Sequence, residues 1–187
     1  MQRPGDGRSV LTDAVIGAAA GAAAVWVMDR VDWFNFLHVV DPEARQRTQA
    51  VRPGGMDPAH VAADKLAQAI GWDLEPKDDN PVGKAVHYSI GIAPAALYGA
   101  LRRTAPAVTT GRGSLFGLSL FLVQDEGLNA LAGLSARPGA YPWQAHARGL
   151  VAHVAYGLVL DAALDLVDRL TEGAGGADHR PVGGDGL

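Results

Sequence analysis

The feature that most constrains this chain is the placing of its charges, which leaves four long stretches almost free of them. These are residues 14–28, 85–101, 113–124 and 149–160, and the second and the fourth each contain one histidine. A helix on the surface of a soluble protein has a polar face, and these stretches have none. Neighbouring residues extend each stretch toward the roughly 20 apolar residues that cross a bilayer. The sequence therefore predicts an all-α fold, a four-helix transmembrane bundle.

We expect a single helical membrane domain over residues 10–170, between a polar tail (1–9) and a disordered glycine-rich tail (171–187). The expected membrane helices cover residues 10–30, 83–102, 112–134 and 142–170. The first connection contains a further signal, because Asp57 precedes a proline and apolar residues follow at helical spacing. This pattern predicts a short amphipathic helix over about residues 58–70, lying against the bundle or the membrane surface.

Two glycine motifs each occur twice, in alternating order. The motif Gly-x3-Gly-x7-Asp begins at Gly17 and again at Gly113, and the motif Gly-x3-His-x3-Gly begins at Gly83 and again at Gly149. The chain therefore reads as an internal repeat of helix pairs, related by a pseudo-twofold axis along the membrane normal. Small residues at such spacing let membrane helices approach closely. The glycines expected at helix contacts are Gly17, Gly21, Gly83, Gly91, Gly113, Gly117, Gly149 and Gly157.

The repeat brings polar residues to one end of the bundle. The outward-running helices end at Asp29 and Asp125, and the returning helices begin near His87 and His153. We therefore expect Asp29 to pair with His87, and Asp125 with His153. Such polar groups must face the bundle interior or a water-filled cavity. The candidate intramembrane site comprises Asp29, His87, Asp125, Glu126, His146, His153 and Asp161. Arg30, Asp32 and Asn129 fall at the same end.

Two interpretations of these polar residues remain open. Histidine changes its charge near neutral pH, so a series of histidines and carboxylates can handle protons or cations. Alternatively, each aspartate and histidine simply satisfies the other inside the packed bundle. The sequence contains no catalytic nucleophile motif, no phosphate-binding loop and no dinucleotide fingerprint. We therefore assign no catalytic residue and do not expect an enzyme.

The same residues could also bind a metal ion or a haem, but the sequence supports these two interpretations less well. No helix contains two histidines four apart or a Glu-x2-His motif, so the identity of any metal stays open. His87 and His153 could serve as the axial ligands of a b-type haem, although close helix packing also accounts for their flanking glycines. Asp57, His60 and Asp64 could form a small surface metal site, but a solvated helix face explains them better. We expect no cofactor.

Composition excludes several classes of protein. The 16 basic residues are outnumbered by 20 acidic ones, so no positive surplus exists for binding nucleic acid. The absence of cysteine excludes disulfides, thiolate metal sites and iron–sulfur clusters. The expected partners are the lipid bilayer and either another copy of the chain or another membrane protein. A non-catalytic membrane assembly factor and a soluble all-helical bundle remain as alternatives.

Part of the chain resembles a known family. His87 opens one expected helix that Tyr98 closes, Arg112 precedes the next, a Gly-Leu-Ser turn begins at Gly133, and a Pro-Trp pair stands before the helix of His153. Over about residues 83–160 this arrangement resembles the YagU-like family of small bacterial inner-membrane proteins of unknown function. The resemblance implies an integral protein of the cytoplasmic membrane and transfers no catalytic residue.

Arginines in the connections predict the orientation. Arg102, Arg103 and Arg112 lie between the second and third expected helices, and positive residues favour the cytoplasmic side. Both termini are therefore expected in the cytoplasm.

Overall fold

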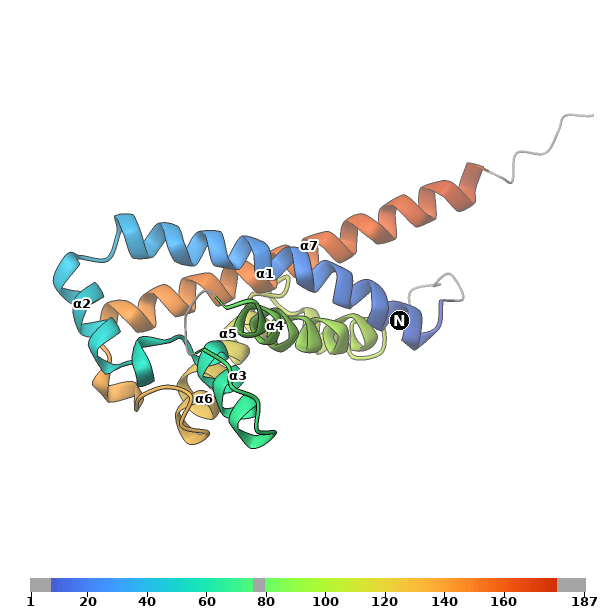
Figure 1. Ribbon diagram of the computed structural model, residues 1–187. Helices are drawn as coiled ribbons and strands as arrows, with labels where there is room; N and C mark the ends of the chain where they lie inside the picture. The colour runs from blue at the N-terminus through green and yellow to red at the C-terminus, as the bar shows by residue number, and fades with distance from the viewer. Residues whose placement is uncertain (1–7, 76–79, 178–187) are drawn as a thin grey trace, which may run out of the picture.

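The computed structural model describes residues 8–75 and 80–177, and every regular element in these two ranges is helical (Figure 1). The principal helices are α1 (Val10–His38), α2 (Pro42–Val51), α3 (Pro58–Ala69), α4 (Pro81–Leu101), α5 (Ser114–Leu120), α6 (Asn129–Leu131) and α7 (Trp143–Ala177). A π-helix, η3 (Phe121–Leu128), joins α5 to α6, and short 3₁₀ turns form η1 (Pro53–Gly55), η2 (Pro106–Thr109) and η4 (Pro138–Ala140).

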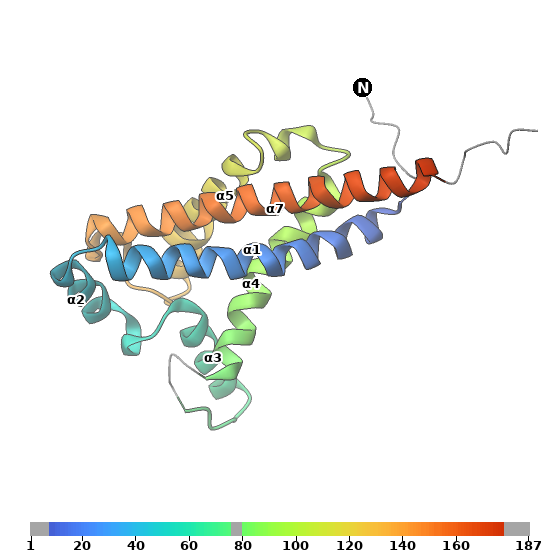
Figure 2. The same ribbon diagram turned by 90° about the horizontal axis from the view of Figure 1, so that it is seen from above.

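The two longest helices, α1 and α7, lie side by side and antiparallel (Figures 1 and 2). Helix α4 crosses α1 obliquely, α5 packs on α7, and α3 packs on α4 (Figure 2). Helix α2 turns back beneath the end of α1, so that α2, α3 and η3 gather at the same end of the molecule as the start of α7 (Figure 1). This end holds the candidate site.

Helix α1 is longer than the sequence predicts, because charge alone does not end a helix. The apolar stretch stops at Asp29, but neither glycine nor proline follows until Pro42, and the helix continues to His38. The N–H groups of Val39 and Val40 then bond to the carbonyl of Asn35, at 2.9 Å each.

Helix α2 was not predicted, although its start is well signalled. Asp41 is its N-cap and Pro42 its first residue. The Ala44 N–H donates to Asp41 Oδ1 at 2.8 Å, and this hydrogen bond holds the pKa of the Asp41 carboxyl below its usual value. Helix α3 agrees with its prediction, since Asp57 caps it by accepting from the N–H groups of Ala59 and His60.

The third and fourth predicted helices also differ in detail. Residues 114–131 form α5, the π-helix and α6 rather than one continuous helix. Gly113 precedes them with a φ of +81°, a backbone conformation that favours glycine. Helix α7 continues to Ala177, so residues 171–177 are helical and not a disordered tail. The remaining tail predictions, for residues 1–7 and 178–187, lie outside the described residues.

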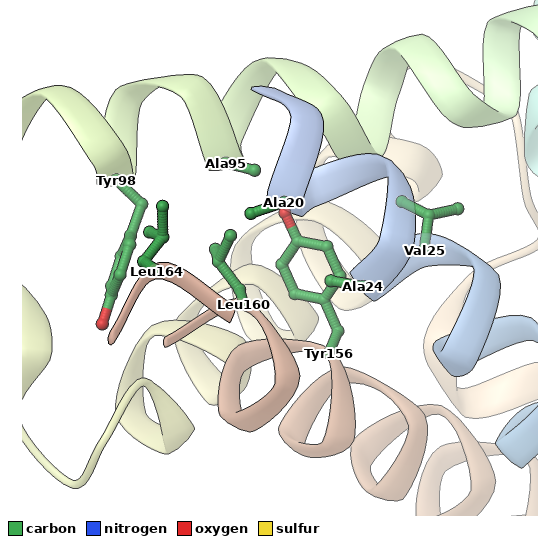
Figure 3. Packing of buried hydrophobic residues seen from close by; sticks show 8 residues of the cluster. All are labelled: Ala20, Ala24, Val25, Ala95, Tyr98, Tyr156, Leu160 and Leu164. Carbon is green, nitrogen blue, oxygen red and sulfur yellow. The ribbon is translucent and has the colours of Figure 1, made fainter. Parts of the chain in front are cut away.

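Small side chains fill the centre of the bundle (Figure 3). Ala20 and Ala24 of α1 lie beside Tyr156 of α7, whose side chain points toward them, whereas Val25 points toward α4 at Gly91. Tyr98 of α4 lies beside Leu164 of α7 in the same view. The full cluster is Ala20, Ala24, Val25, Ala95, Tyr98, Tyr156, Leu160 and Leu164. Because alanine occupies several of these positions, the helices approach closely.

All eight predicted packing glycines lie at close contacts between helices. A Cβ at Gly17 would meet the α4 backbone at Ala95, and one at Gly113 would overlap the α7 backbone at Gly157. Gly83 lies under the ring of His60, on α3. These contacts make α1 antiparallel to α4 and α5 antiparallel to α7, as the repeat predicts.

Two of the described helices are long and apolar enough to cross a membrane, namely α1 and the Trp143–Glu172 part of α7. Helix α4 carries Lys84 and His87 near its start, and the third predicted span is divided by the π-helix. The helical fold is therefore established over the described residues, and two helices are compatible with a membrane location.

Candidate functional site

A cavity of about 1120 Å³ lies among α1, α2, α3, α4, η3 and α7. Six of the seven predicted site residues line it: Asp29, His87, Asp125, Glu126, His146 and His153. Arg30, Asp32 and Asn129, which the repeat places at the same end, line it as well. Polar residues from both halves of the predicted repeat, around Asp29 and His87 and around Asp125 and His153, therefore line the same cavity.

The first predicted pair forms a direct hydrogen bond. His87 Nε2 lies 2.8 Å from Asp29 Oδ1, joining α4 to α1. Both side chains are about one-third exposed, so the pair lies at the cavity wall rather than deep in the core. Along the same helix contact, Gly91 makes room for Val25 one turn away from the pair. The glycine spacing thus sets the distance at which Asp29 and His87 meet.

The π-helix presents two consecutive carboxylates to α7. Glu126 Oε1 lies 2.6 Å from His146 Nδ1, while Asp125 Oδ2 lies 3.7 Å from His153 Nδ1. His146 and His153 are two turns apart on α7, roughly 10 Å along its axis. A π-helix has hydrogen bonds between residues five apart, so its turns are wider than those of an α-helix, and such segments are frequent at functional sites. Sequence reasoning did not predict the π-helix.

The hydrogen bonds of His146 locate a proton. His146 Nε2 lies 3.1 Å from the carbonyl oxygen of Pro138, which can only accept, so Nε2 carries a hydrogen. Its Nδ1 lies 2.6 Å from Glu126 Oε1, so the His146 ring joins the π-helix to the turn that begins at Pro138.

The second predicted pair is not hydrogen-bonded. His153 Nδ1 donates to the carbonyl oxygen of Gly149 at 2.9 Å, and its 3.7 Å separation from Asp125 is an electrostatic contact. His153 is nearly buried, with 5% of its side chain exposed, and its ring also packs on Phe121. Asp125 therefore lies near His153 but does not accept a hydrogen bond from it.

Asp161 does not belong to the cavity. Its Oδ1 accepts a hydrogen bond of 2.6 Å from the hydroxyl of Tyr98, and both residues are buried in the core. Asp161 is eight residues beyond His153, so the two lie roughly 12 Å apart along α7. The candidate site predicted from the sequence included Asp161, and the structure places it outside the cavity lining.

Two pairs at the cavity were missed. His60 Nδ1 lies 2.8 Å from Asp57 Oδ2, and only 4% of the His60 side chain is exposed, so the prediction of a solvated helix face is wrong for His60. Arg148 of α7 pairs with Asp32 of α1 at 3.0 Å and lies over the ring of Phe36. The N-cap position of Asp57 was the available signal for the first pair. No sequence signal joins Asp32 to Arg148.

A second charged cluster lies at the opposite end of the bundle. Arg102 donates to Asp165 and to Asp168, and Arg103 also reaches Asp168 at 3.1 Å. Arg8 pairs with Asp168 as well, so this cluster joins the start of α1 and the end of α4 to α7. The bundle therefore carries charged groups at both ends, and the apolar core between them contains the buried Tyr98–Asp161 pair.

Over residues 8–75 and 80–177, no group of three or more histidine, aspartate or glutamate side chains is arranged to hold a metal ion. His87 Nε2, one of the nitrogens that a haem iron would need, is engaged with Asp29. A comparison of the chain with known protein families, with curated proteins and with solved structures finds no match.

Proposed function

We propose that this chain is an integral membrane protein that takes up and releases protons, or binds a small cation, at the histidine–carboxylate pairs of its cavity. One observation carries the proposal: four imidazoles, each within 3.7 Å of a carboxylate, line the same space. The pairs are His60–Asp57, His87–Asp29, His146–Glu126 and His153–Asp125. A carboxylate stabilises the charged imidazole, and histidine changes its charge near neutral pH.

The surface of the bundle supports a membrane location. In the most apolar 18-residue window, only 28% of α1 and 39% of α7 is buried within the chain. Large apolar side chains face outward along both helices, among them Val15 and Leu166, each more than half exposed. A soluble core helix would be covered by its neighbours, whereas lipid favours such exposure. We propose α4 and the α5–η3–α6 segment as the two shorter members of a four-helix transmembrane bundle.

Charge placement supports an orientation with both termini in the cytoplasm. Arg8, Arg102 and Arg103 meet at the end opposite the cavity, and Arg112 lies in the same connection as the last two. The cavity then opens on the outer side of the membrane. We further propose the bacterial cytoplasmic membrane as the location, which is what the resemblance to the YagU-like family implies.

Membrane insertion has a direct test in the expressed chain. We expect the protein to stay in the membrane pellet after an alkaline carbonate wash and to dissolve only on addition of detergent, because the apolar surface is then held in lipid. A peripheral protein expressed alongside should be released by the same wash. Release of this chain into the aqueous fraction would favour the soluble helical bundle instead.

Proton handling can be measured in vesicles that contain the purified protein and a pH-sensitive dye. We expect an imposed potential to drive proton flux, and the His87→Gln variant to lower that flux at least several-fold, because glutamine cannot carry the proton held between His87 and Asp29. His38→Gln is the matched control, since His38 is exposed and lies outside the cavity lining.

The same variants separate the proposal from a purely structural role. If His87 serves packing alone, His87→Leu will impair folding, since it leaves Asp29 without its partner. Normal folding together with lost flux favours proton handling. Absence of flux in the wild-type protein, with indifference to both substitutions, would contradict the proposal and favour a membrane assembly factor.

A further inference from the structure

Asp161 is a buried acidic group that does not belong to the cavity. It joins α7 to α4, because its Oδ1 accepts a hydrogen bond of 2.6 Å from the hydroxyl of Tyr98, and the residue is only 6% exposed. Arg102, one turn beyond Tyr98 on α4, donates instead to Asp165 and Asp168. Asp161 is thus bonded to a neutral hydroxyl. A carboxylate buried in this way is costly, and between membrane helices such a group marks the path of an ion or a proton.

Asp161 lies between the two polar ends of the bundle. On α7 it is eight residues beyond His153, which lines the cavity, and four residues before Asp165 of the charged cluster at the opposite end. The rise of the helix makes these separations roughly 12 Å and 6 Å along its axis. Asp161 therefore occupies the interval that a proton must cross to pass from the cavity to the charged cluster.

The described helices offer no second acidic or basic side chain in this interval. Between the cavity and the charged cluster, α1, α4, the α5–η3 segment and α7 contribute residues 14–28, 89–101, 114–124 and 154–164. Asp161 is the one aspartate, glutamate, histidine, lysine or arginine in these four ranges. Proton conduction through the bundle would therefore use Asp161.

Three aromatic rings lead from the cavity to Asp161. Tyr156 lines the cavity and donates to the carbonyl oxygen of Gly91 at 2.7 Å. The ring of Phe116 packs against both Tyr156 and Tyr98. Figure 3 shows Tyr98 extending from α4 toward α7, and Tyr156 extending in the opposite direction. A metal cation in this place would need about six oxygen ligands, which the side chains of Asp161 and Tyr98 do not supply, whereas a proton needs one acceptor.

We propose that Asp161 carries protons between the cavity and the charged cluster at the opposite end. A proton delivered by water from the cavity binds the Asp161 carboxylate, the acid so formed stays hydrogen-bonded to Tyr98, and the same proton then leaves on water toward Asp165. One O–H bond forms and the same bond breaks, so the charge of Asp161 is restored after each passage. The inference rests on the proposed function and deepens it, because it names the proton as the cation and gives its route through the bundle.

The test is Asp161→Asn in the full-length protein, reconstituted in vesicles that contain a pH-sensitive dye. Asparagine has nearly the same shape and keeps an oxygen that can accept from Tyr98, but it cannot take up the proton. We expect the proton flux to fall to that of vesicles without protein, with the circular dichroism spectrum and the elution in gel filtration unchanged. A purely structural role of Asp161 would leave the flux unchanged, since the hydrogen bond remains. Asp73→Asn is the matched control and should conduct like the wild type, because Asp73 is exposed and lies outside the cavity lining.

A double variant covers the case in which asparagine disturbs folding. Tyr98→Phe combined with Asp161→Ala removes both partners of the buried hydrogen bond, so neither is left unsatisfied. This variant should fold and should also lack flux. Flux at the wild-type level in either folded variant would overturn the inference. If His87→Gln lowered the flux in the same experiment, the proposed function would remain supported, whereas absence of flux in the wild-type protein would overturn both.

Discussion

The substitution Gly157→Leu should lower the free energy of unfolding by about 3 kcal/mol, at the upper end of the range for overpacked cores. A Cβ at Gly157 would overlap the backbone of Gly113 and lie 3.0 Å from the backbone nitrogen of Gly117. These obstacles are main-chain atoms of α5, which cannot rotate away as a side chain can. Helix α5 would have to separate from α7, and with it the start of the π-helix that carries Asp125.

Gly139→Leu is the matched control, because a Cβ at Gly139 meets no atom within 4 Å and its backbone φ is not positive. We expect this variant to unfold like the wild-type protein. The measurement is unfolding by titration with a denaturing detergent, followed by circular dichroism. Equal stability of Gly157→Leu and Gly139→Leu would show that α5 and α7 are not in backbone contact.

The glycine spacing predicted which helix faces meet, but not the register of every pair. In the first half Gly17 meets Ala95 and Gly99, which correspond to Asp161 and Asp165, whereas Gly113 lies closest to Gly157, one to two helical turns away. This slide carries His153 past Asp125, so its Nδ1 donates to a backbone carbonyl instead. Register depends on how side chains fit across the contact, and spacing along one helix does not contain that information.

The cavity was predicted in part for a similar reason. Hydropathy places charged residues at helix ends, and this was enough to bring Asp29, His87 and Glu126 to one end of the bundle. The contribution of α3 was missed, because the His60 ring is buried in the space that a side chain at position 83 of α4 would fill, and Gly83 leaves that space open. The hydrogen bond between Asp161 and Tyr98 could not be predicted, since nothing in the helix of Asp161 indicates that Tyr98 lies opposite. Contacts between distant segments are decided by tertiary packing.

At the other end of the bundle, Arg102→Met should lower the free energy of unfolding by about 3 kcal/mol. The Arg102 side chain is 8% exposed and donates to both Asp165 and Asp168. Methionine keeps much of the length and removes the charge, which leaves Asp165 without this hydrogen bond, while Asp168 still has Arg103 at 3.1 Å. We take the low end of the range for broken buried pairs because Asp165 is 41% exposed.

The control for this variant is Arg47→Met, which removes an exposed pair with Glu43 on α2 and should cost less than about 0.5 kcal/mol. Adding Asp165→Asn to Arg102→Met should recover part of the lost stability, because the unpaired charge is then gone. Both effects are measured by the same detergent titration. If Arg102→Met proves as stable as Arg47→Met, the charged cluster does not fasten α4 to α7, and that contact depends on the Tyr98–Asp161 hydrogen bond and on the small apolar residues around it.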